Sequence, residues 1–117
     1  MHVNIQPYYN GGLSSDAGTF LLNQYEIVVN ACVGKNVIVS EAGWPSAGGS
    51  HGDAVASSQD QEIAITAIYE ATNGQVTFFS FGDDAWKNPP GPEQHFGIFL
   101  PSCWLCSKSR VGCAGLF

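Results

Sequence analysis

The sequence predicts an α/β fold in which three parallel strands alternate with two helices. Three short runs, at 3–6, 37–39 and 76–79, are rich in the β-branched and aromatic residues that favour strands. Two longer segments, 16–32 and 58–72, repeat apolar residues at the spacing of an amphipathic helix. Strands that alternate with helices are joined by right-handed crossovers, so the three strands are expected to run parallel.

The first strand and first helix have clear boundaries. The strand 3–6 is expected to end at Pro7, and Gly34 is expected to end the helix 16–32. The apolar face of this helix is predicted to comprise residues 17, 20, 21, 25, 28, 29 and 32.

The second strand, 37–39, is a β-branched run typical of a strand buried on both faces. A loop rich in glycine and serine, 46–53, separates it from the helix 58–72. Residues 58–61 have the spacing of a capping box, and Asn73-Gly74 is a stop signal. The apolar face of the second helix is predicted to comprise residues 63, 64, 67, 68 and 71.

Charge and cysteine content divide the chain near residue 100. Residues 1–93 hold all ten acids and two lysines, a net charge of −8, whereas 94–117 hold Lys108 and Arg110 and no acid, a net charge of +2. We therefore expect an α/β unit at 1–100 and a separate cysteine-containing tail at 101–117.

The composition excludes several classes of protein. The 117 residues suffice for one domain at most, and 44% hydrophobic residues argue against disorder. A net charge of −6 disfavours a nucleic-acid partner. No apolar run approaches the ~20 residues of a membrane span, and this chain shows no signal peptide.

Polar and aromatic residues follow each predicted strand. The carboxyl ends of parallel strands share one edge of a sheet, where α/β proteins bind ligands. Aromatic rings stack on sugars, and carboxylates bond hydroxyls or attack an anomeric carbon, so this set of residues predicts a sugar site. The set comprises Gln6, Tyr8, Tyr9, Glu41, Trp44, Asp83, Asp84, Trp86 and Lys87.

Three separated motifs resemble glycoside hydrolase family 17, the β-1,3-glucanases and glucanosyltransferases of fungal and plant cell walls. VIVSEAGWPSAG at 37–48 is similar to the nucleophile segment, with Ala42 where the family usually has Thr. VNIQPYY at 3–9 resembles a strand ending in a His-Pro-aromatic pair, with Gln6 replacing the His. FFSFGDDAWK at 78–87, followed by PEQHFGIF at 92–99, resembles the last barrel strand and its loop.

The resemblance implies the C-terminal part of a (β/α)8 barrel and a retaining mechanism without a cofactor or metal. It assigns Glu41 as the nucleophile that attacks C1 of the sugar. Asp84, Lys87 and Glu93 match ancillary charged positions near the catalytic pair. Sugar contacts are expected from Tyr8, Tyr9, Trp44 and Trp86, for which core or rim packing is the alternative. The implied ligand is β-1,3-glucan or a gluco-oligosaccharide, and the implied location is extracellular or in the cell wall.

The chain lacks parts that a complete enzyme of this type needs. The family's acid/base is a Glu after an Asn, and no such pair occurs here. Three strands are also far short of a barrel of eight strands and ~250 residues. We therefore expect a fragment whose partner is the missing N-terminal part of the barrel. The alternative is a small three-stranded domain that folds alone or by pairing.

Three functions remain open from the sequence. The first is a retaining glucan hydrolase or transglycosylase, and the second is a non-catalytic β-glucan-binding fragment. The third is a metal or redox module built on Cys103, Cys106 and Cys113, although Cys32, the fourth cysteine, lies far upstream.

Overall fold

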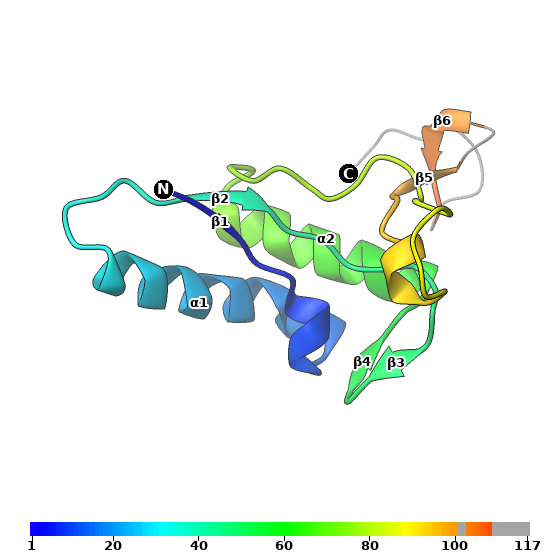
Figure 1. Cartoon of the computed structure of the whole chain (residues 1–117), viewed down its shortest axis with the longest axis horizontal. Helices are drawn as coiled ribbons and strands as arrows, with labels where there is room; N and C mark the ends of the chain where they lie inside the picture. The colour runs from blue at the N-terminus through cyan, green and yellow to red at the C-terminus, as the bar shows by residue number, and fades with distance from the viewer. Residues whose placement is uncertain (101–102, 109–117) are drawn as a thin grey trace.

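A computed structural model describes residues 1–100 and 103–108 of the chain. Its two helices, α1 (Ala17–Ala31) and α2 (Ser58–Thr72), lie beside the strands β1 (His2–Asn4) and β2 (Ile38–Glu41) (Figure 1). Both helices occupy the predicted segments to within a residue, and the mixed α/β class is confirmed.

Two strands form a ladder, and a third makes one bridge beside it. β1 and β2 pair in parallel, with His2 opposite Ile38. The predicted strand 76–79 also runs parallel, but it forms only the bridge between Ala42 and Phe78. No described strand pairs with the far side of this segment.

The helices cover one face of this sheet. The core cluster of Ile5, Val39, Leu21 and Ile68 joins both strands to both helices, and all four are at most 6% exposed. Ile38 of β2 remains 45% exposed.

α2 begins at Ser58 as predicted, but its capping residue differs from the predicted one by one position. Ser57, not Ser58, is the cap, because Ser57 has the extended backbone that a cap requires. The Asp60 amide donates to Ser57 Oγ (3.0 Å), and Ser57 Oγ donates to Asp60 Oδ2 (2.6 Å). Asn73, with a φ of 52°, ends the helix as predicted.

The buried face of α2 is also rotated from the expected one. Ile63 is 40% exposed, whereas Gln61 is only 3% exposed. The interior accepts Gln61 because its amide donates to the carbonyls of Trp44 (2.9 Å) and Gly97 (3.1 Å). The residues that α2 buries are Gln61, Ala64, Ile65 and Ile68.

Short elements complete the described chain. None of its helices is long and apolar enough to cross a membrane.

β6 pairs antiparallel with β5, so the backbone of 103–107 adjoins the end of the predicted 1–100 unit. The short elements are η1 (Pro7–Asn10), η2 (Ser14–Asp16), β3 (Ser50–His51), β4 (Ala54–Val55), η3 (Pro92–Gln94), β5 (Phe99–Leu100) and β6 (Cys103–Ser107).

Gly18 tests the packing of α1 against α2. A Cβ at Gly18 would lie 2.5 Å from the carbonyl oxygen of Ala67, so Gly18→Ala is expected to lower the free energy of unfolding by about 1–3 kcal/mol. The control is Gly12→Ala, because a Cβ there meets only Asn10 Nδ2 at 3.8 Å. Urea denaturation measures both, and a Gly18→Ala chain as stable as the parent would contradict the packing.

Candidate functional site

Glu41 lies where the sequence places it, at the carboxyl end of β2. Its backbone carbonyl accepts a hydrogen bond from the Ile5 amide (2.9 Å), which fixes the end of β2 beside the end of β1. Its side chain is partly buried, and no hydrogen bond or ion pair joins its carboxylate to another residue of the described chain. The carboxylate is therefore available to a ligand.

Tyr9 and Glu93 join two loops at this edge. η1 follows β1 directly, and the Tyr9 hydroxyl donates to Glu93 Oε1 in the loop after residues 76–79. Burial, and then the hydrogen bond and negative charge of Glu93, raise the pKa of Tyr9 well above its ordinary 10.0. Tyr9 is still 39% exposed, so it can contact a ligand while Glu93 holds its hydroxyl.

Lys87 forms ion pairs with two carboxylates of the same loop, those of Asp84 and Glu93. Its Nζ lies 3.2 Å from Asp84 Oδ2 and 3.6 Å from Glu93 Oε2, and 4.6 Å from the centre of the Phe79 ring. One lysine thus faces two carboxylates. Because partly exposed ion pairs contribute little singly, we interpret the network as orienting hydrogen-bonding groups.

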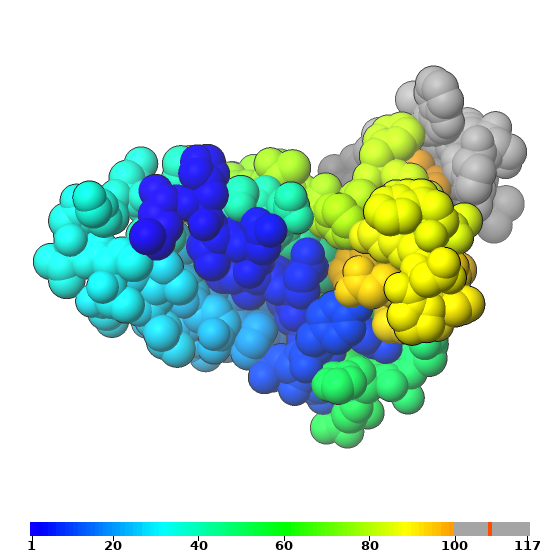
Figure 2. Space-filling model, in the orientation of Figure 1, coloured from blue at the N-terminus to red at the C-terminus, as the bar shows by residue number. Residues whose placement is uncertain are grey.

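Phe96 packs the two loops together. Its ring is 2% exposed, stacks on Tyr9 with centroids 6.2 Å apart, and lies 5.7 Å from the Phe79 ring. Figure 2 shows the same closure on the surface, where the block formed by residues 80–95 abuts the residues that follow β1. The structure therefore brings Tyr9, Asp84, Lys87 and Glu93 together; the sequence analysis expected the first three at a common edge and assigned Glu93 by the resemblance.

The aromatic residues of the predicted site divide into two groups. Tyr8 and Trp44 are 1% and 0% exposed, and their rings meet edge to face at 5.4 Å. The Trp44 indole N–H donates to the Val55 carbonyl (2.8 Å). This placement corrects their expected sugar contact, because they offer no surface to a ligand. They instead support from the inside the rim, which is the partly exposed group formed by Tyr9, Asp84, Lys87 and Glu93. Trp86, by contrast, is 76% exposed.

Two residues of this region, Gln61 and Lys108, were not predicted as parts of a site, and the partner of the predicted Asp83 was not predicted either. Gln61 joins the backbone at Trp44 to the backbone at Gly97, and a glutamine near the apolar face of a helix was the only signal for it. Asp83 and Lys108 form an ion pair at 2.5 Å across 25 residues, for which the sequence holds no signal.

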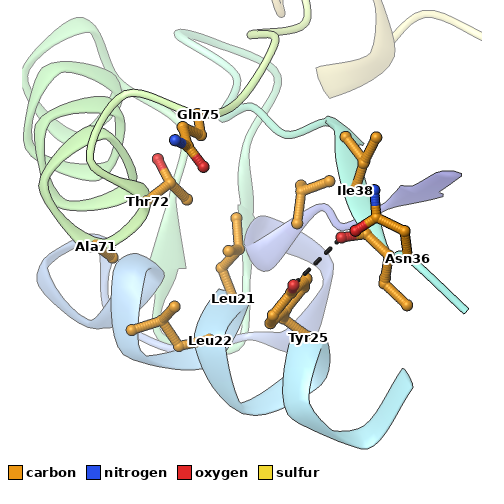
Figure 3. A pocket seen from close by; sticks show the side chains of 10 residues that line it. Leu21, Leu22, Tyr25, Asn36, Ile38, Ala71, Thr72 and Gln75 are labelled. Carbon is orange, nitrogen blue, oxygen red and sulfur yellow. Dashed lines mark hydrogen bonds between the residues drawn. The ribbon is translucent and has the colours of Figure 1, made fainter. Parts of the chain in front are cut away.

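A cavity of about 390 Å³ lies elsewhere, between the helices and the beginning of β2 (Figure 3). Leu21, Leu22 and Ile38 line it, and the Tyr25 hydroxyl at its wall donates to the Val37 carbonyl (3.2 Å). None of its ten lining residues is charged. Because it lies toward the amino ends of the strands and lacks a carboxylate, it does not provide the chemistry of Glu41.

The described chain contains no group of three or more His, Cys, Asp or Glu side chains that could hold a metal ion. Cys32 is a free thiol within the described chain. The proposed roles of Cys103, Cys106 and Cys113 concern side chains outside the described residues.

Comparisons with known proteins identify the family. Residues 1–97 match the model of the BtgE/BtgC glycoside hydrolase domain. The chain is 39% identical over 100 residues to the probable β-glucosidase btgE of Aspergillus fumigatus, covering 83% of this chain and 18% of the relative. It is 38% identical over 102 residues to the probable family 17 glucosidase SCW10 of Saccharomyces cerevisiae, covering 84% and 26%.

Solved structures agree with this assignment. A family 17 β-1,3-glucanosyltransferase from Rhizomucor miehei is 34% identical, with a TM-score of 0.74, and the match covers 83% of this chain and 37% of that one. An active-site mutant of that enzyme in complex with laminaritriose is 32% identical, with a TM-score of 0.76, and the match covers 86% and 38%. The chain therefore spans less than half the length of these relatives.

Removing the charge of Glu93 tests the rim. Glu93→Gln is expected to lower the pKa of Tyr9, because the raised pKa rests partly on that carboxylate. The phenolate absorbance of each chain, compared with its Tyr9→Phe counterpart, reports the ionisation.

Glu70→Gln, an exposed position on α2, is the control. A Tyr9 that ionises at the same pH with and without Glu93 would contradict the contact. Because the folded-state pKa lies above that of the unfolded chain, the stability contributed by Tyr9 is complete below about pH 10 and falls as the pH rises further.

Proposed function

The chain belongs to the BtgE/BtgC glycoside hydrolase family, and on that premise we propose that it is the C-terminal part of a retaining glycosidase acting on β-1,3-glucan. Glu41 is the proposed nucleophile. The observation that carries this proposal is its carboxylate at the end of β2, which makes no hydrogen bond or ion pair within the described chain and lies in the segment 37–48 that resembles the family's nucleophile segment.

The relatives support the substrate class. One is a β-1,3-glucanosyltransferase, and a mutant of it was solved with laminaritriose. We propose that this chain also binds a β-1,3-linked gluco-oligosaccharide. Tyr9 and Trp86 would contact its sugar rings, while Asp84, Lys87 and Glu93 would meet its hydroxyls.

The proposed chemistry uses Glu41 in its ionised form. Its oxygen attacks C1, the glycosidic bond breaks, and the leaving oxygen takes a proton from an acid on another part of the barrel. Such an acid lies ~5–5.5 Å from the nucleophile in retaining enzymes. Water or a second sugar then releases the glycosyl group, which gives hydrolysis or transfer respectively.

A further relative suggests where such a protein acts. It is the cell surface mannoprotein MP65 of Candida albicans, 36% identical over 103 residues, covering 85% of this chain and 27% of the relative. We propose an extracellular or cell-wall location for the protein to which this chain belongs.

A second function, glucan binding without turnover, rests on Trp86. An indole that is 76% exposed beside Lys87, whose Nζ lies 5.8 Å from its ring centre, offers a flat surface for a sugar. Binding at this surface requires no acid/base group.

Covalent trapping tests the nucleophile. A 2-deoxy-2-fluoro-β-glucoside with a dinitrophenolate leaving group needs no acid, so it is expected to label Glu41 in this chain. Mass spectrometry of peptides locates the label. Glu41→Gln is expected to abolish it, and Glu26→Gln, an exposed position on α1, to leave it unchanged. Labelling of another carboxylate in the folded chain would refute the assignment.

Oligosaccharide affinity tests the binding surface. Trp86→Ala is expected to weaken laminari-oligosaccharide binding about tenfold, equivalent to roughly 1.4 kcal/mol. Tyr69→Ala, an exposed aromatic on α2, is the control. Isothermal titration measures both, with Glu41→Gln expected to bind as the parent chain does. Equal affinities of the Trp86→Ala and parent chains would exclude this surface.

A further inference from the structure

Asp83 lies at the centre of a set of contacts outside the rim described above. Its Oδ1 accepts hydrogen bonds from Lys108 Nζ (2.5 Å) and from the Gly97 amide (2.9 Å). His95 Nδ1 lies 3.6 Å from its other oxygen. These groups come from residues 80–98 and from the segment that follows β6.

Lys108 extends these contacts to the loop after the nucleophile. The same Nζ donates to Ser46 Oγ (2.9 Å), and the Ser46 amide donates to the His95 carbonyl (2.8 Å). The Lys108 side chain is only 10% exposed and that of Asp83 25% exposed. Water screens such a pair less than a surface pair. Removing one of the two side chains therefore leaves the other charge largely buried and without its partner.

The loop after Glu41 is packed tightly against the same segment. A Cβ at Gly43 would lie 2.1 Å from the Phe79 carbonyl oxygen, and a Cβ at Gly48 would lie 2.3 Å from the Pro92 nitrogen. The Ser46 contact lies between these two approaches along the chain. A displacement at Ser46 therefore acts on a segment that begins two residues after Glu41.

We propose that Asp83 and Lys108 are positioning residues that hold the loop 43–48, and through it Glu41, in the geometry needed for attack. Lys108 lies beyond the residues matched by the family model, 1–97, so this chain supplies the cation from its own C-terminal segment. The effect on Glu41 rests on the proposed function, whereas the effect on the loop does not.

Three variants distinguish a role of this ion pair in holding the loop from a role in folding alone. Lys108→Met removes the cation with little change in length, and Lys108→Arg keeps it. Asp83→Asn removes the charge but retains an oxygen for the Gly97 amide. Lys35→Met, an exposed lysine between α1 and β2, is the matched control.

The first readout is independent of activity. NMR hydrogen exchange of the Ser46 amide is expected to accelerate at least tenfold in Lys108→Met and in Asp83→Asn, to return toward the parent rate in Lys108→Arg, and to be unchanged in Lys35→Met. If Lys108→Met does not fold, Asp83→Asn and Lys108→Arg decide the question. Unchanged exchange in the variants that remove a charge would overturn the proposal.

The second readout is the rate of labelling of Glu41 by the fluoroglucoside. The maximal rate constant of labelling is expected to fall about tenfold with the half-saturating concentration unchanged, because misplaced groups slow attack more than binding. Faster exchange with an unchanged labelling rate would overturn the positioning role. A parent chain that is never labelled would refute the nucleophile itself, while the exchange data still decide whether the pair holds the loop.

Discussion

The backbone contact between residues 42–43 and 77–79 sets the geometry of the site. Ala42 donates to the Thr77 carbonyl (3.1 Å), and the Phe79 amide donates to the Ala42 carbonyl (2.8 Å). Gly43 follows at a point where any side chain would collide with the Phe79 carbonyl. These contacts fix the strand that ends in Glu41 beside the loop that carries Lys87 and Glu93, so every rim interaction depends on them.

Much of this arrangement follows from local sequence signals. The helical spacing of apolar residues predicts α2, because a helix in the folded chain keeps that spacing. The order of elements predicts parallel strands, whose carboxyl ends must share an edge. The contact between Tyr9 and Glu93, 84 residues apart, fits that edge, although no local pattern specifies their pairing.

Other features depend on tertiary packing and lie beyond sequence reasoning. Tyr8 and Trp44 have the composition of a sugar platform, but the hairpin β3–β4 packs against η1, and both rings are buried. Gln61 is buried because two backbone carbonyls happen to face it. The contact of Lys108 with Asp83 joins a segment that nothing in the sequence assigns to the site.

We propose that this chain packs a sugar-binding edge around Glu41 even though it spans only part of its relatives. Near-UV circular dichroism during a thermal melt, with and without laminari-oligosaccharide, tests it most directly, because that signal requires fixed aromatic packing. We predict a cooperative transition that the sugar shifts to higher temperature. A non-cooperative melt, or a cooperative one that the sugar does not shift, would contradict the claim.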